Sequence, residues 1–273
     1  MKKIKLYSGI LAITSLLLSS CSTLEDRKDI DNIVTTPVDY TAKQTLGYDN
    51  QLVVTLNNTN AVVFWDIVSY DSHTPITTSN KRIDTLTLPF KGDYLLRIYT
   101  YFHSGVIKDS VKLTATADDK NYFGNPYWGL LTNSSDGKYW KLAAKYVGPQ
   151  SNYQSIWWQP DISTYAWAND SIYFDLNMGF HFKKFQNDTI TTGSFTIEKP
   201  VAPDTCSFAP YVVSLKNGAS MPNDDASEMA PANTNKFRIF KLTTDTLIVG
   251  QGSSLTAARH SEDWSWYWLF VRK

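Results

Sequence analysis

The segment from 153 to 167 combines the side chains that carbohydrate recognition uses: aromatic rings, amides and carboxylates. A sugar ring presents an apolar C–H face that stacks on tryptophan or tyrosine, while polar side chains bind its hydroxyl groups. Because adjacent residues of an extended segment point to opposite faces, we expect at least one of Trp157 and Trp158 to be buried. The sequence predicts a glycan-binding loop formed by Tyr153, Trp157, Trp158, Gln159, Asp161, Tyr165 and Trp167.

A second aromatic group lies near the C-terminus, between residues 263 and 271. In an extended segment one face would carry Trp264, Trp266, Trp268 and Phe270, and the other Tyr267, Leu269 and Val271. Both faces are apolar, which is typical of a central strand that is buried on both sides. We therefore expect most of these rings in the core. Trp264 follows Glu262 and Asp263, and we expect it to be exposed and to contribute to glycan binding.

The ionisable residues show no pattern for catalysis or for metal binding. Glycoside hydrolysis needs two carboxylates about 5 to 10 Å apart. None of the four glutamates sits in a Glu-x-Asp-type pair on an expected strand; they are Glu25, Glu198, Glu228 and Glu262. The histidines form no short ligand motif; they are His73, His103, His181 and His260. Turns and hydroxyl binding explain Asp161, Asp170 and Asp175 better than catalysis does. We expect no catalytic residue, metal or cofactor, and keep a glycoside-active enzyme as the less favoured alternative.

The charge balance gives no support for nucleic-acid binding, because 26 basic side chains are matched by 26 acidic ones. The chain has two cysteines, so no disulfide framework can be built if one of them is modified. We expect Cys206 to be a small buried apolar residue.

The first residues read as an export signal. Three lysines, at positions 2, 3 and 5, precede an apolar run from 10 to 18 that is too short to span a membrane. The sequence Leu18-Ser19-Ser20-Cys21 then resembles a lipobox, the site where bacterial lipoproteins are cleaved and lipidated. This implies a signal peptide over 1–20, a lipid on Cys21 that anchors the chain to a membrane, and a flexible tether over 21–38. The alternative is an ordinary secretory signal with a coincidental cysteine.

The residues beside Cys21 also bear on localisation. Ser22 rather than aspartate fits sorting to the outer membrane, and Glu25 with Asp26 resembles, weakly, the signal that sends Bacteroidota lipoproteins to the cell surface. We expect an outer-membrane protein that faces the cell exterior.

Short strands separated by turn signals fill the interval 39–117 and predict an antiparallel sandwich. Three motifs in order resemble a PKD domain, which has an immunoglobulin-like fold: Phe64-Trp65-Asp66, Thr78-Ser79-Asn80 and the run from Leu88 to Tyr94. The stretch from 67 to 73 departs from the family turn after Trp-Asp, so no ligand role is carried over to it. We expect Trp65 in the core between two sheets.

The interval 122–273 is again strand-like, and Asp118-Asp119-Lys120-Asn121 reads as a hinge before it. Asn177-Met178-Gly179 between two apolar strands predicts a hairpin, and 216–235 predicts a long loop. We find no helical periodicity of useful length after the signal peptide. The fold expected is all-β, with a larger antiparallel β-sandwich or jelly roll as a carbohydrate-binding domain after the immunoglobulin-like one.

Several motifs in this half resemble the C-terminal domain of PKD-containing lipoproteins from Bacteroidota polysaccharide-utilisation systems. They are Tyr139-Trp140-Lys141, Ile156-Trp157-Trp158, Asn169-Asp170-Ser171 and the terminal Trp266-Tyr267-Trp268 run. The resemblance implies a protein that holds a polysaccharide or oligosaccharide beside an outer-membrane transporter. Two alternatives stay open: a structural or adhesive surface protein that contacts other proteins, and a barrel for a hydrophobic ligand.

Overall fold

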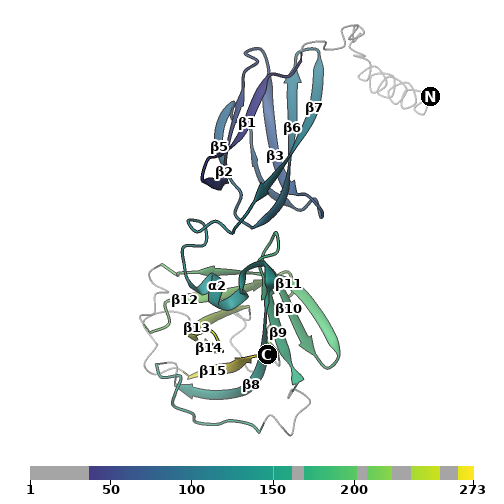
Figure 1. Ribbon diagram of the computed structural model, residues 1–273. Helices are drawn as coiled ribbons and strands as arrows, with labels where there is room; N and C mark the ends of the chain where they lie inside the picture. Colours follow the sequence, from purple (N-terminus) through teal and green to yellow (C-terminus); the bar gives the residue numbers. More distant parts are fainter. Residues whose placement is uncertain (1–36, 150, 162–168, 202–207, 223–234, 253–263) are drawn as a thin grey trace, which may run out of the picture.

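The computed structural model describes residues 37–149, 151–161, 169–201, 208–222, 235–252 and 264–273 (Figure 1). Within these residues a β-sandwich of a three-stranded and a four-stranded sheet is followed by a closed eight-stranded barrel. The prediction of an all-β protein is confirmed.

The sandwich comes first along the chain. One sheet has the strand order β1-β2-β5 and the other β4-β3-β6-β7. Their bounds are β1 (Tyr40–Thr45), β2 (Tyr48–Leu56), β3 (Val62–Ser69), β4 (Pro75–Ser79), β5 (Ile83–Thr87), β6 (Gly92–Phe102) and β7 (Gly105–Ala115). The sandwich therefore occupies 40–115, inside the interval 39–117 that the sequence suggested.

Alternation of apolar residues builds the sandwich core. Leu52, Val54 and Leu56 of β2 face the other sheet, where Tyr94, Leu96 and Ile98 of β6 are buried in the same cluster. Trp65 of β3 is fully buried between the sheets, and its indole N–H donates to the carbonyl of Lys81 at 2.9 Å. Its predicted core position is confirmed.

The barrel contains the strands β8 (Lys138–Pro149), β9 (Ser171–Asp175), β10 (His181–Gln186), β11 (Thr189–Glu198), β12 (Tyr211–Lys216), β13 (Lys236–Leu242), β14 (Thr246–Gly252) and β15 (Trp264–Arg272). Each strand pairs antiparallel with the next one, and β15 returns to pair with β8. The prediction of a sandwich or jelly roll for this half is therefore wrong. A jelly roll splits its strands between two sheets, whereas here one sheet closes on itself.

Large side chains fill the inside of the barrel. Trp140, Phe174, Phe182, Phe237 and Trp268 are all fully buried in one cluster. An eight-stranded barrel has an interior that side chains can just fill, so its core is packed in the way of a small globular domain. For the described residues this gives no support to the alternative of a barrel around a hydrophobic ligand.

One end of the barrel is covered by a helix that the sequence did not predict. The helix α2 (Tyr127–Thr132) inserts Leu131 into the barrel core. The indole N–H of Trp140 donates to the carbonyl of Leu131 at 2.9 Å, and the ammonium of Lys138 donates to that of Leu130 at 2.8 Å. The helix is too short for a 3.6-residue period to be recognised, which is why periodicity missed it.

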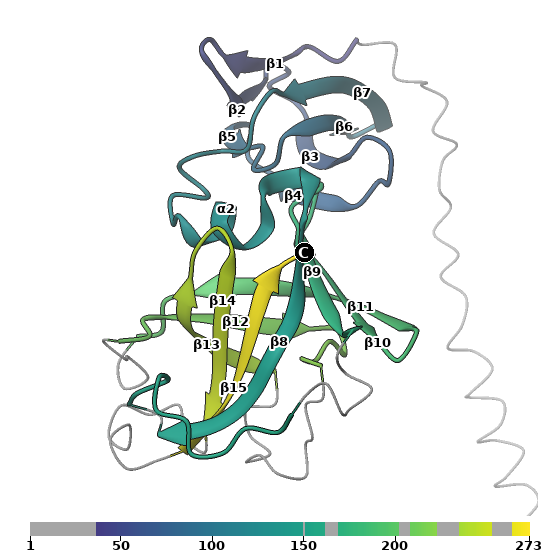
Figure 2. The same ribbon diagram turned by 60° about the horizontal axis from the view of Figure 1, so that its bottom comes forward.

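The sandwich and the covered end of the barrel are in contact. Phe90, from the loop between β5 and β6, belongs to the barrel core, and Met178 of the β9–β10 hairpin packs on both cores. The expected hinge is held on both sides: Asp118 accepts a hydrogen bond from Ser134, and Asp119 accepts one from Tyr48 at 2.6 Å. It is therefore a fixed connection. In Figure 2 the strand β8 ends and β15 begins at the side of the barrel away from the sandwich.

Candidate functional site

The two adjacent tryptophans of the predicted loop lie beside the end of β8. Val147 donates its backbone N–H to the carbonyl of Trp158 at 2.8 Å, and its own carbonyl accepts the N–H of Trp157 at 2.8 Å. This single antiparallel bridge fixes the backbone of both tryptophans at the barrel end that lies away from the sandwich.

Both rings are exposed to solvent, Trp157 by 59% and Trp158 by 53%. The expectation that at least one would be buried is wrong. Alternation buries a side chain only where another layer covers that face of the sheet. Beyond Lys141 the strand β8 no longer pairs with β9, and Val147 pairs instead with Trp158. The tryptophan segment is therefore an edge that a single bridge joins to the barrel, and the described residues leave more than half of each tryptophan exposed.

A third exposed tryptophan begins the neighbouring strand. Trp264 of β15 pairs with Pro149 of β8 and is 37% exposed, as predicted for the first ring of this strand. Next along the same face, Trp266 is buried, and the ring of Trp158 meets it edge-on, with 5.7 Å between centroids. We call Trp157, Trp158, Trp264 and Trp266 the rim cluster.

The middle of β15 is buried on both faces, as the sequence predicted, whereas Val271 near its end is 38% exposed. Trp266, Trp268 and Phe270 face the barrel core, while Tyr267 faces an outer cluster with Tyr146. The hydroxyl of Tyr267 donates to the carbonyl of Pro149 at 2.8 Å, which ties the start of β15 to the end of β8. The rim cluster therefore stands on a rigid base.

A buried cation lies below the rim cluster. The ammonium of Lys145 is 4.3 Å from the centroid of the Trp266 ring and 5.4 Å from that of Trp268. Lys145 itself is almost fully buried. A cation at this distance is attracted to the electron-rich faces of the rings that it contacts. Sequence reasoning missed this residue, although a lysine inside the apolar run from 142 to 147 is a signal that could have been noticed.

The other predicted residues are distributed differently. Gln159 and Asp161 are exposed; Gln159 follows Trp158 directly, and Asp161 follows the buried Pro160. Tyr153 is half-buried on the outer wall of the barrel, where its ring is 5.9 Å from that of Phe240 and its carbonyl accepts the hydroxyl of Tyr146 at 2.9 Å. Tyr165, Trp167, Cys21 and Cys206 lie outside the described residues.

An aspartate, a histidine and a serine, the residue types of a catalytic triad, lie together on the outer wall of the barrel. Asp175, His181 and Ser194 are in register on β9, β10 and β11. His181 Nδ1 and Asp175 Oδ1 are 2.7 Å apart, but Ser194 Oγ accepts the amide of Asn217 at 2.9 Å. The hydrogen bonds found for the described residues do not join Ser194 to His181, and a serine nucleophile would need that bond.

The described residues include neither a metal-binding cluster nor a membrane-spanning helix. Among them, no three His, Cys, Asp or Glu side chains come close enough together to hold a metal ion. No helix in the described part of the chain has both the length and the apolar character to cross a membrane. No family model and no curated protein matches this sequence. The rim cluster is therefore characterised by its own geometry.

Proposed function

We propose that this chain binds polysaccharide without converting it, through the rim cluster, as a lipid-anchored protein on the outer face of the outer membrane. The observation that supports glycan binding is the exposure of Trp157, Trp158 and Trp264 together at one end of a rigid barrel. Exposing three tryptophans costs hydrophobic free energy, which binding to an apolar sugar face recovers.

The neighbouring polar groups suit the same ligand. Gln159 offers both a donor and acceptors for hydroxyl groups, and Asp161 offers acceptors. Stacking supplies affinity, while these groups would fix the orientation of the sugar.

The order of the two domains fits display at a surface. The sandwich, which we propose is a PKD-type spacer, lies between the N-terminal anchor at Cys21 and the barrel along the chain. The rim cluster is at the barrel end away from the sandwich (Figure 2). A polysaccharide held there would be presented away from the membrane, beside an outer-membrane transporter that we propose as the partner.

Affinity electrophoresis tests the binding. The mature protein is run in native gels that contain xylan, laminarin or mucin, together with Trp157→Ala, Trp158→Ala and the double variant. We expect retardation of the wild type and a loss of about tenfold in affinity for each single variant, since a stacked aromatic contributes roughly 0.5–1.5 kcal/mol beyond its buried area. Tyr101→Ala removes an exposed ring from β6 of the sandwich and is the control. Equal retardation of the wild type and the double variant would contradict the proposal.

A protein partner is the second candidate, and one observation favours it. Ile156 is 52% exposed directly before the two tryptophans, and an aliphatic side chain contributes little to sugar stacking. An adhesive surface would use Ile156 as well as the rings. Ile156→Asn should leave retardation by polysaccharide unchanged if the ligand is a glycan, whereas it should weaken capture of a protein partner.

A further inference from the structure

A second group of aromatic rings lies on the outer wall of the barrel, away from the rim cluster. Tyr139 of β8 is in register with Tyr173 of β9, and their ring centroids are 4.5 Å apart. The ring of Phe185, on β10, is 5.7 Å from that of Tyr139. We call these three residues the wall cluster. Trp140 adjoins Tyr139, and Ile172 and Phe174 adjoin Tyr173; all three point into the barrel core, as does Phe182, three residues before Phe185 on β10. By alternation the three rings of the wall cluster therefore point outward.

The wall cluster is exposed and held in position. Tyr139 is 43% exposed, and Tyr173 and Phe185 are partly exposed. The hydroxyl of Tyr173 donates to the carbonyl of Asp136 at 3.3 Å, and its ring occupies space that any side chain at Gly137 would fill. Side chains that are already ordered lose little conformational entropy when a ligand binds.

Two open hollows of about 530 Å³ each flank Phe185 and share Asn169. The lining of one hollow also includes Tyr139, Ser171 and Lys273. These volumes lie within the range of ligand sites, roughly 300–1,000 Å³. Because Phe185 and Asn169 belong to both hollows, the rings and the polar groups form one continuous surface.

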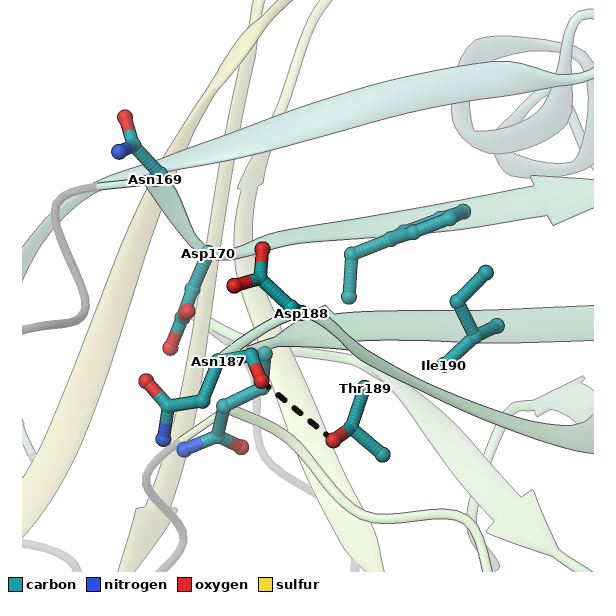
Figure 3. Close-up of a pocket in the computed structure, with 8 residues that line it drawn as sticks. Asn169, Asp170, Asn187, Asp188, Thr189 and Ile190 are labelled. Atoms are coloured by element: carbon teal, nitrogen blue, oxygen red, sulfur yellow. Dashed lines mark hydrogen bonds between the residues drawn. The ribbon is translucent and has the colours of Figure 1, made fainter.

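The other hollow is rich in amides and carboxylates. Figure 3 shows Asp170, Asn187 and Asp188 gathered at one end of it and Ile190 at the other. Asn187 and Asp188 form the two-residue turn between β10 and β11, and both have positive φ, 50° and 59°. This is the geometry of a tight type I′ hairpin turn, which fixes the directions of both side chains.

We propose that the wall cluster is a second carbohydrate-binding site, which stacks a pyranose of the same polysaccharide chain that the rim cluster binds. The ligand class of this second site is the one given in the proposed function, so this inference rests on that proposal. Aromatic rings beside exposed amides match a sugar, which presents an apolar face and a hydroxyl edge at once. A protein interface of this size would instead be depleted of carboxylates at its centre.

The two sites lie on one strand and suit a polymer. Tyr139 is near the start of β8 and Val147, beside the rim cluster, near its end; at roughly 3.3 Å per residue they are about 26 Å apart. A single sugar cannot reach both sites, whereas a polysaccharide can. Two linked sites raise the apparent affinity for a polymer well above that for a short oligosaccharide.

Four proteins in the same affinity gels test this proposal: the wild type, Trp157→Ala/Trp158→Ala, Tyr139→Ala, and the triple variant. We expect weak residual retardation of the double tryptophan variant, a loss of about three- to tenfold for Tyr139→Ala, and no retardation of the triple variant. Asn169→Ala, which removes a polar group without touching the ring packing, should also weaken binding, and circular dichroism checks that each variant is folded. Tyr101→Ala is again the control.

The outcomes separate the two proposals. If Tyr139→Ala and Asn169→Ala bind like the wild type while the tryptophan variants lose binding, the wall site is refuted and the proposed function stands. If the wall variants lose binding while the tryptophan variants keep it, the wall site is supported and the rim cluster is refuted. If no polysaccharide retards the wild type, both are refuted.

Discussion

At the scale of single residues, one extra residue decides which face of β8 each side chain occupies. The register between β8 and β15 shifts at Ala143, so Leu142 before it and Lys145 beyond it both face the core. Bulges of this kind re-aim the side chains that follow. Without the shift Lys145 would point outward, and Val147 would not place Trp158 against Trp266. The position of the rim cluster therefore depends on a bulge that has no marker in the sequence.

Gly137 allows a direct test of how the wall cluster is positioned. Its φ is +76°, and a Cβ there would lie within 1.8 Å of the Tyr173 hydroxyl oxygen. We predict that Gly137→Ala lowers the free energy of unfolding by about 1–3 kcal/mol through backbone strain and also displaces the Tyr173 ring. Gly47→Ala is the matched control, because Gly47 has the same φ with no atom within 4 Å. Urea unfolding gives the stability, and NMR shifts of the Tyr173 ring give its position; unchanged shifts in Gly137→Ala would contradict the prediction.

At the scale of elements, local patterns predicted most strands but not how they close. The hairpin around Asn177-Met178-Gly179 and the strands on either side of the 216–235 loop follow from alternation and turn residues. The barrel depends on the pairing of β15 with β8, for example Tyr267 with Tyr146, and pairing at this sequence separation leaves no local signal. The composition of the segment 153–167 was likewise enough to predict an aromatic loop. The exposure of its rings could not be predicted, because it depends on which faces other parts of the fold cover.

The two sheets of the sandwich are joined at an edge by a tyrosine. The Tyr40 hydroxyl of β1 donates to Asp109 of β7 at 2.8 Å. Burial, with this hydrogen bond and the charge of Asp109, raises the pKa of Tyr40 to about 12 from an ordinary value of 10.0. Since the folded state holds the proton more tightly, the stabilisation is complete below pH 10 and is lost as the pH rises from 10 to 12.

This pKa shift predicts an alkaline signature. The difference in free energy of unfolding between wild type and Tyr40→Phe should be constant from pH 8 to 9.5 and should shrink toward pH 12. Urea titrations at half-unit steps measure it, and Tyr101→Phe on β6 is the control. A difference that does not change with pH up to 12 would show that the Tyr40 hydroxyl titrates alike in the folded and unfolded chain.

At the scale of the whole molecule, aromatic packing makes the two domains one body. Phe90 leaves the sandwich and meets Phe123 and Phe180 at centroid distances of 5.6 and 5.3 Å. Its backbone N–H donates to the Tyr94 hydroxyl, which in turn donates to the Phe90 carbonyl. The sandwich therefore fixes the loop that inserts into the barrel, and the direction of the rim cluster follows from the orientation of the sandwich.

This shared core predicts cooperative unfolding. The wild type should melt in a single calorimetric transition, because separating the domains would expose Phe90, Phe123 and Phe180 to water. Phe90→Ala should lower the free energy of unfolding by about 3–5 kcal/mol and split the transition in two, since it removes the sandwich side chain that is buried in the barrel core. Phe195→Ala is the matched control, because Phe195 is as buried as Phe90 but comes from the barrel and packs within the barrel cluster. It should lower the free energy of unfolding by a similar amount without removing a contact between the domains. Scanning calorimetry distinguishes the two variants. The ratio of calorimetric to van't Hoff enthalpy should be near one for Phe195→Ala and above one for Phe90→Ala. Two transitions in the wild type, or one in Phe90→Ala at a similarly reduced melting temperature, would show that the contact does not couple the domains.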